Sequence, residues 1–462
     1  MRQSALRTVA VALTLALAGP AWAQLPGGLG LPGGILPGGG ASPLPGPLSD
    51  VEPATRLNRT LQDGLDPAEG SLAAARSLAT GVVSELRRRT ADQLLRRHGD
   101  VVEADDQGQP VVRGEVLALA PSPAALARAK AAGFQTRRRT DLDALGLQAV
   151  VLAPPRGMSA PEAVRRLRDL DPQGTYDFNH LFQAGGAAGP AAAPAGPGGA
   201  APAPGGRLGL VDGSPATRHP ALRGAKVTGR AFAPGGARVT AHATAVASLM
   251  VGDGGRFRGG APRASLLVAD VYGPTPTGGS AEAIVRGLAW LAQNRVWVVN
   301  ISLVGPPNRL LQAAVAAMVA KGHVLVAAVG NDGPSAPPLY PASYPGVVAV
   351  TAVDGGRRIL PEAGRGTHVD FAAPGADMAA AAPGGGYVAV RGTSFAAPLV
   401  AGMIARQTPW TSAPAAVEAL GRGALDLGAP GNDRVYGRGL VAAELRTEPG
   451  RVGAQAAALR GP

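Results

Sequence analysis

Three side chains with complementary chemistry lie far apart in the sequence, each beside an apolar run or a helix start. Asp212 directly follows the apolar residues Leu208–Val211. His242 opens a stretch of small residues with helical spacing, and Ser394 opens another. Together, such residues can act as orienting carboxylate, general base and nucleophile. Taken singly, each has an ordinary structural interpretation: a turn cap, a core histidine or an N-cap serine.

The segment around the serine carries the sharpest signal. Gly392–Pro398 reads Gly-Thr-Ser-Phe-Ala-Ala-Pro, which places Ser394 at the start of a small-residue helix. Unpaired backbone N–H groups at a helix start can stabilise developing negative charge. We expect the helix to tolerate Pro398 because the first turn needs no intrahelical amide. Asn331, after the apolar run Val324–Ala328, could donate its carboxamide to an oxyanion, although a loop asparagine often only holds a turn.

Strands that alternate with helices must position these groups. Five apolar runs without polar alternation predict strands buried on both faces of a parallel sheet: Leu208–Val211, Leu266–Val271, Val296–Ile301, Val324–Ala328 and Val347–Ala352. Helical patterns lie between them, notably at 281–293 and 308–320. The sequence therefore predicts a doubly wound α/β domain with a mostly parallel sheet, whose chemistry lies beyond the carboxyl ends of the strands.

The order Asp, His, Asn, Ser in these contexts resembles the subtilisin family of serine peptidases over about Arg207–Leu445. Further motifs carry the same resemblance: Arg218–Leu222, Ser302–Gly305, Tyr340–Ala342, Ala373–Gly375 and Tyr436–Leu440. The resemblance implies that His242 accepts the Ser394 hydroxyl proton while Asp212 orients the imidazole. It also implies that Asn331 and the Ser394 backbone N–H stabilise the tetrahedral oxyanion.

The resemblance implies a substrate cleft as well. Its wall would be an added-strand site formed by Ser302, Leu303, Val304 and Gly305. Leu339 falls where the family places the floor of the S1 pocket. A leucine there would make the pocket shallow and apolar, so we expect a preference for small P1 residues such as alanine.

Three departures from the family pattern lie beside the triad. Gly213-Ser214 replaces the usual Ser or Thr followed by Gly, Ala243 replaces a glycine, and Phe395 replaces a methionine. None removes a catalytic group, so we expect activity to be retained. The short segment between His242 and the 266–271 run holds Asp253 as its single acid. We therefore expect no strong calcium loop, no required metal and no cofactor, although calcium binding elsewhere stays possible.

The N-terminal half predicts export and a proenzyme. Basic residues, an apolar run and Ala21-Trp22-Ala23 predict a cleaved signal peptide over 1–23 and an exported product, periplasmic or secreted. Strand and helix patterns over 113–183 predict a small α+β domain, whose element order and position resemble the family's inhibitory propeptides. The other predicted segments are a Gly/Pro-rich spacer at 24–50, a helical region of unknown role at 51–112, an Ala/Gly/Pro linker open to proteolysis at 184–206, the catalytic domain at 207–445 and a C-terminal tail at 446–462.

Composition excludes some chemistry and leaves two other interpretations open. The absence of cysteine excludes a thiol nucleophile and cysteine-ligated zinc. A net charge of +12 and clusters such as Arg137-Arg138-Arg139 could indicate a nucleic-acid binder, but the clusters lack interleaved aromatic residues and are better explained as a solvated basic face. The leading hypothesis is an exported, self-processed, monomeric serine endopeptidase that acts on proteins or peptides and binds its own propeptide-like domain. The first alternative is a catalytically inactive family member that serves as a binding protein.

Overall fold

The computed structural model describes residues 89–184, 187–188, 206–407 and 409–453. The signal peptide, the spacer, residues 51–88, most of the 184–206 linker and the last nine residues lie outside these ranges. A helix spans residues 89–97, within the region predicted to be helical. In the described part of the chain, no helix is both long and apolar enough to cross a bilayer.

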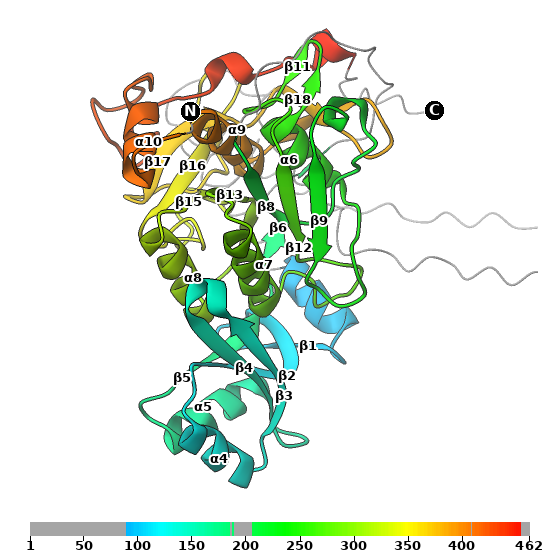
Figure 1. Cartoon of the computed structure of the whole chain (residues 1–462), viewed down its shortest axis with the longest axis vertical. Helices are drawn as coiled ribbons and strands as arrows, with labels where there is room; N and C mark the ends of the chain where they lie inside the picture. The colour runs from blue at the N-terminus through cyan, green and yellow to red at the C-terminus, as the bar shows by residue number, and fades with distance from the viewer. Residues whose placement is uncertain (1–88, 185–186, 189–205, 408, 454–462) are drawn as a thin grey trace, which may run out of the picture. The chain divides into compact units, whose positions relative to one another are not determined.

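A parallel seven-stranded sheet forms the centre of the larger domain (Figure 1). In hydrogen-bonding order its strands are β17 (Val369–Pro374), β16 (Val347–Val353), β15 (Val324–Ala328), β13 (Val298–Ile301), β8 (Leu208–Asp212), β12 (Leu266–Asp270) and β9 (Val227–Ala231). Every neighbouring pair is parallel. This topology confirms the predicted doubly wound α/β fold, and the five predicted strands are all present.

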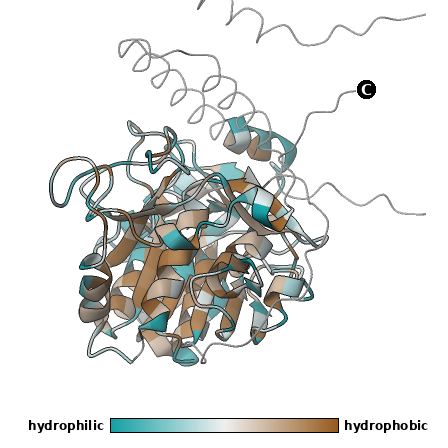
Figure 2. Cartoon of the chain, turned by 90° about the horizontal axis from the view of Figure 1, so that it is seen from above, coloured by the Kyte–Doolittle hydropathy of each residue, from teal (hydrophilic) through white to brown (hydrophobic). Residues whose placement is uncertain are grey.

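Helices cover both faces of this sheet. On one face, α6 (Ala241–Val251) and α9 (Thr393–Arg406) share an apolar core with the strands, and α10 (Ala413–Gly421) packs against α9. On the other face, α7 (Ala281–Gln293) and α8 (Arg309–Ala320) bury a second core. Figure 2 shows the hydrophobic strands and helix faces gathered in the interior, with hydrophilic residues toward the outside. Burial of apolar surface on both faces is the main force that holds the domain together.

The strand order reverses direction at β8. From β8 the chain builds β9 and β12 on one side of it, then β13, β15, β16 and β17 on the other. In open α/β sheets, ligands bind at such a switch point, beyond the carboxyl ends of the strands. Asp212 is the last residue of β8 and therefore lies at this point.

Short elements complete the larger domain. The additional strands are β10 (Asp253–Gly254), β11 (Phe257–Arg258), β14 (Leu303–Val304), β18 (Met378–Ala381) and β19 (Tyr387–Arg391). The 3-10 turns are η2 (Pro220–Leu222), η3 (Ala443–Leu445) and η4 (Pro449–Val452).

The smaller domain is an antiparallel five-stranded sheet with two helices. Its strands are β1 (Val102–Ala104), β2 (Pro110–Leu119), β3 (Gln135–Leu142), β4 (Leu147–Ala153) and β5 (Thr175–His180). The helices are α4 (Pro123–Ala131) and α5 (Ala160–Leu170), and the turn η1 (Asp143–Leu145) joins β3 to β4. The predicted two-layer α+β domain is present, but its sheet extends N-terminal of the predicted boundary at 113, since β1 pairs with β2.

Side chains of the small sheet alternate between two cores. Val116 and Val150 face α4 and α5, whereas Leu117 and Val151 belong to the same buried cluster as α7 and α8. Both faces are therefore apolar, which is the pattern expected of a sheet packed between two layers of helices. One face of the small sheet packs on α4 and α5, and its other face packs on α7 and α8 of the larger domain.

The prediction that Arg137–Arg139 form a solvated basic face is wrong for Arg138. These residues lie on β3, a strand that sequence patterning missed because its Gln-Thr-Arg-Arg-Arg-Thr-Asp-Leu sequence has no apolar run. The Arg138 guanidinium contacts Glu115 at 2.9 Å and Glu282, on α7, at 3.2 Å. The carboxylates of Glu115 and Glu282 are nearly buried, so Arg138 neutralises both where the two domains meet.

Candidate active site

The carboxylate of Asp212 is buried and held by two hydrogen bonds. The Gly213 N–H donates to Oδ1 at 2.6 Å, and Oδ2 lies 2.7 Å from Nδ1 of His242. Only 1% of Asp212 is exposed, so no solvent competes for these contacts. An acceptor at Nδ1 selects the imidazole tautomer whose Nε2 lone pair is free to accept a proton.

His242 is the second residue of α6, and the start of this helix is capped. The Thr240 hydroxyl oxygen accepts a hydrogen bond from the Ala243 N–H at 3.0 Å. This cap fixes the first turn of the helix, and therefore the backbone of His242, against the end of β8. The sequence prediction that His242 opens a small-residue helix packed on the sheet is confirmed by geometry.

The unusual Gly213-Ser214 pair has a steric reason. A Cβ atom at position 213 would lie 2.8 Å from Cγ2 of Thr240, the residue that caps α6. Glycine therefore permits the close approach between the end of β8 and the helix that carries His242. The Ser214 hydroxyl in turn donates to Asp270 at the end of β12, at 2.7 Å. The departure from the family pattern is thus accommodated beside Asp212 without displacing its carboxylate from His242.

Ser394 is the second residue of α9 and is fully buried. The helix begins after Gly392, whose φ of 134° lies in a region that favours glycine. The Ser394 hydroxyl donates to the Ser302 carbonyl at 3.4 Å. Within the described residues, Nε2 of His242 is buried and has no hydrogen-bond partner. The helix start leaves the Ser394 N–H without an intrahelical acceptor, as an oxyanion donor requires.

The sequence predicted Pro398 in the first turn of α9, and this prediction is wrong. Pro398 is the sixth residue of the helix. A proline there removes the hydrogen bond to the carbonyl four residues earlier, which belongs to Ser394. The buried Ser302 hydroxyl replaces it and donates to the Ser394 carbonyl at 3.0 Å. Asn300 donates to the same hydroxyl at 2.8 Å. The Ser302 side chain therefore supports the nucleophile rather than facing the substrate cleft.

Asn331 lies beside the first turn of α9. Its Oδ1 accepts a hydrogen bond from the Thr393 N–H at 3.0 Å, which leaves the Nδ2 group as the donor for an oxyanion. The preceding Gly330 N–H donates to the Thr393 hydroxyl at 3.2 Å. Sequence reasoning overlooked Thr393 as the residue that orients Asn331. Its position next to Ser394 was the available signal.

The two remaining departures pack around the imidazole. Ala243 is fully buried in α6. The Phe395 ring, also fully buried, lies 5.4 Å from the His242 ring, measured between centroids. Both side chains add apolar contact next to His242 without occupying the position of a triad member.

A tyrosine that the sequence did not single out lies near the triad. The Tyr272 hydroxyl is buried and has no hydrogen-bond partner among the described residues. Its pKa is raised well above the ordinary value because burial disfavours the phenolate, and because the nearby Asp212 and Asp270 carboxylates repel it. The hydroxyl therefore stays protonated and does not act as a base.

A segment of the chain itself pairs with β14, the strand that we predicted would pair with the substrate. Leu303 and Val304 of β14 pair antiparallel with Ala184 and Gln183, which form β6 (Gln183–Ala184). Two residues further on, β7 (Ala187–Ala188) pairs antiparallel with Val390 and Arg391 of β19, the strand that leads into Ser394. β6 and β7, on either side of residues 185–186, thus pair with two different strands of the larger domain.

Gly305 and Leu339, two of the residues predicted to bind substrate, are both closely packed. Gly305 exchanges two backbone hydrogen bonds with Tyr340, at 2.9 and 3.0 Å. A Cβ at Gly305 would meet the Phe182 ring, so only glycine leaves room for it. The Leu339 side chain covers Gly330, since a Cβ there would lie 2.5 Å from Leu339 Cδ1. Leu339 therefore lies against the residue that precedes Asn331, and its role as the S1 floor stays a prediction.

The single acid of the segment that we expect to lack a calcium loop has a partner. Asp253 lies 2.7 Å from the Arg263 guanidinium, and its carboxylate is nearly buried. Among the residues that the structure describes, no three or more His, Asp or Glu side chains form a group that could hold a metal ion.

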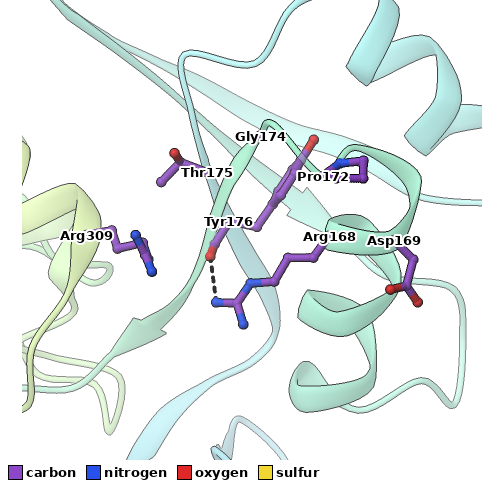
Figure 3. A pocket seen from close by; sticks show the side chains of 7 residues that line it. All are labelled: Arg168, Asp169, Pro172, Gly174, Thr175, Tyr176 and Arg309. Carbon is purple, nitrogen blue, oxygen red and sulfur yellow. Dashed lines mark hydrogen bonds between the residues drawn. The ribbon is translucent and has the colours of Figure 1, made fainter.

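A pocket of about 620 Å³ lies elsewhere, between the small domain and the start of α8. Figure 3 shows its lining residues, among them Arg168, Asp169 and Tyr176 of the small domain and Arg309 of α8. Arg168 donates to the Tyr176 carbonyl at 3.1 Å. The pocket contains none of the predicted site residues, and its charges of both signs define no ligand.

Comparisons with known proteins find a related family. A family model described as the subtilase family matches residues 233–439. Subtilisin E of Bacillus subtilis is 36% identical over 193 residues, 40% of this chain and 49% of that protein. The chain thus spans about half the length of this relative. Subtilisin DY of Bacillus licheniformis is 33% identical over 254 residues, 52% of this chain and 90% of that protein.

The fold has a counterpart among solved structures. Fervidolysin from Fervidobacterium pennivorans, described as a keratinolytic enzyme related to subtilisin, superposes with a TM-score of 0.62. The match covers 74% of this chain and 62% of fervidolysin, at 20% sequence identity. At that identity the likeness establishes the shared fold alone.

Proposed function

The chain belongs to the subtilase family of serine peptidases, and from this premise we propose that it is an exported serine endopeptidase, synthesised as a proenzyme that its own active site cleaves. The observation that carries the proposal is the contact between His242 and Asp212 at 2.7 Å, together with a buried Ser394 at the start of α9, the helix that packs against α6. Export rests on the signal-like sequence over 1–23.

The proposed reaction is acyl transfer to Ser394 followed by hydrolysis. His242 Nε2 takes the Ser394 hydroxyl proton as the oxygen attacks a peptide carbonyl, and it then gives that proton to the leaving amine. Asp212, within 2.7 Å of Nδ1, stabilises the imidazolium that forms. The Asn331 carboxamide and the Ser394 N–H donate to the oxyanion of the tetrahedral intermediate. Water then releases the acyl group by the same steps in reverse order.

The proposed propeptide is the small domain predicted at 113–183, whose sheet begins further upstream with β1. At its C-terminal end, β6 pairs with β14, where a substrate would add as a strand. Its sheet shares a buried core with α7 and α8, and Arg138 links it to Glu282. These contacts support a role as an inhibitor that covers the cleft until cleavage. The enzyme's other proposed partners are protein or peptide substrates, and we propose that it acts as a monomer.

Self-cleavage is expected between Ala184 and Ala187. The residues on either side of this interval pair with β14 and β19, and β19 ends three residues before Ser394. Cleavage there places Ala184 or one of two glycines at P1, in keeping with a shallow S1 pocket floored by Leu339. Intact mass and N-terminal sequencing of the purified chain over time should yield a product that begins at residue 185, 186 or 187. Cleavage confined to 189–206, or after a large or charged residue, would contradict this assignment.

We also propose that catalysis needs no metal ion. Asp253, the one acid between His242 and β12, is already paired with Arg263. Casein hydrolysis by the processed enzyme should therefore change less than about twofold after dialysis against EDTA, because no step of the reaction uses a cation. A loss of activity that added calcium restores would reveal a required site and disprove this expectation.

A further inference from the structure

An ion pair lies directly upstream of the nucleophile. Arg391 is the last residue of β19, three residues before Ser394. Its guanidinium pairs with Glu362: Nη2 donates a hydrogen bond to Oε2 at 2.9 Å, and Nε lies 2.7 Å from Oε1 in a charge contact that lacks hydrogen-bond geometry. The two side chains are 20% and 9% exposed, so solvent screens the pair only partly. A charge-assisted hydrogen bond in such a site holds the two side chains together more strongly than a neutral one.

The glutamate end of this pair also holds the loop that carries Asn331. The backbone carbonyl of Glu362 accepts a hydrogen bond from the Gly333 N–H at 2.8 Å. Two residues later, the Gly364 N–H donates to the Gly330 carbonyl at 3.0 Å. These bonds bracket Asn331, one on each side of it in the sequence. The approach at Gly364 is close enough that a Cβ there would lie 2.9 Å from the Val329 carbonyl oxygen.

Arg391 is followed by Thr393, which contacts the same loop from its other side. Two residues after Arg391, Thr393 donates its N–H to Asn331 Oδ1 at 3.0 Å and accepts from the Gly330 N–H at 3.2 Å. The segment 330–333 is therefore hydrogen-bonded to residues 362–364 on one side and to Thr393 on the other. The Arg391–Glu362 pair links the segment before Thr393 to the segment that contains Glu362, so that the two segments that contact the loop also contact each other.

We propose that the Arg391–Glu362 ion pair is a positioning device for the oxyanion hole, which sets the Asn331 carboxamide relative to Ser394. Neither side chain touches the reacting atoms, and both act through the backbone of the loop and the helix start. The inference rests on the proposed peptidase function. It adds to that function a pair of residues whose effect falls on the transition state, because the oxyanion forms only there.

Glu362→Gln tests the proposal because it removes the charge while keeping the shape. A donor in an oxyanion hole contributes about 10²–10³-fold to kcat, so its partial displacement should lower kcat about tenfold. KM should change less than about twofold, since peptide pairing with β14 does not involve the pair. Rates are measured on a chromogenic Ala-rich peptide with processed enzyme. They are normalised to the fraction of serine labelled by a fluorophosphonate.

The decisive comparison combines Glu362→Gln with Asn331→Ala. If the ion pair acts through Asn331, adding Glu362→Gln to Asn331→Ala should lower kcat less than about twofold further. The same tenfold drop in both backgrounds, or a rise in KM alone, would overturn the proposal. Asp253→Asn, which breaks a comparably buried Arg–carboxylate pair away from this loop, is the matched control and should leave kcat unchanged.

A second readout separates positioning from loss of folding. Affinity for a peptide aldehyde, whose adduct carries the oxyanion, should fall about tenfold with Glu362→Gln, in parallel with kcat. Glu362→Asp, which keeps the charge, should recover part of the loss. Equal affinity in wild type and Glu362→Gln would overturn the proposal. Wild-type enzyme that hydrolyses no peptide would instead disprove the proposed function, and the inference with it.

Discussion

Ser394→Ala is expected to leave a chain that folds, stays intact and hydrolyses no casein. The substitution removes the only atom that attacks the peptide carbonyl, so turnover should fall by at least about 10⁴-fold. Self-cleavage between residues 184 and 187 should stop as well, because it uses the same hydroxyl. Intact mass over time, beside wild type prepared identically, measures both effects.

Two additions make this comparison specific. Ser412→Ala removes an exposed helix-capping serine of α10 and should process like wild type. Processed wild-type enzyme added in trace amount to the Ser394→Ala chain tests whether the cleavage segment is accessible to a second molecule. If Ser394→Ala loses the same mass as wild type, another protease cuts the chain. If both chains stay intact and inert, the inactive binding protein becomes the better hypothesis.

Asp212→Asn should lower kcat about 10⁴-fold while the fold is kept. The asparagine can still accept from the Gly213 N–H through its oxygen, as Oδ1 does at 2.6 Å. Its amide group, however, would donate to His242 Nδ1, which favours the tautomer whose proton is on Nε2. That imidazole cannot accept the serine proton. Initial rates over a range of peptide concentrations give kcat and KM separately and measure the effect.

The control for Asp212→Asn is Asp354→Asn. Asp354 pairs with Arg358 at 2.9 Å on the surface of the larger domain, so its substitution should change kcat less than about twofold. A loss below about tenfold for Asp212→Asn would mean that His242 does not depend on this carboxylate, contrary to the assigned roles. Circular dichroism of both variants distinguishes lost catalysis from lost folding.

The parts of the fold that sequence patterning predicted are those in which burial acts on a continuous run. The five central strands are predominantly apolar, with few polar residues such as Asn300 and Thr351, because helices cover both faces of the sheet. β9 escaped prediction since it is an edge strand whose Val-Thr-Gly-Arg-Ala sequence is largely exposed. β3 escaped because arginines occupy it, and their carboxylate partners come from distant parts of the chain. Local sequence carries no record of such long-range pairing.

The residues of the candidate site also divide into those with a local sequence signal and those whose roles depend on distant contacts. Asp212, His242, Ser394 and Asn331 lie in short motifs whose helix or strand context is local, so their positions could be predicted. The role of Ser302 could not, since it depends on a carbonyl freed by Pro398 almost a hundred residues later. Glu362 and Arg391 gave no signal because each is an ordinary surface residue type in its own segment.

The replacement of a helix hydrogen bond by the Ser302 hydroxyl has an evolutionary consequence. A proline in a helix interior costs roughly 3 kcal/mol, part of which a substitute donor recovers. Loss of Ser302 alone would leave the buried Ser394 carbonyl without a donor, whereas an N–H at position 398 would only add a second donor to a carbonyl that can accept two. Ser302 is therefore expected to tolerate substitution only after Pro398 has been replaced, while Pro398 can change first. A distant proline thus imposes an evolutionary constraint on this serine.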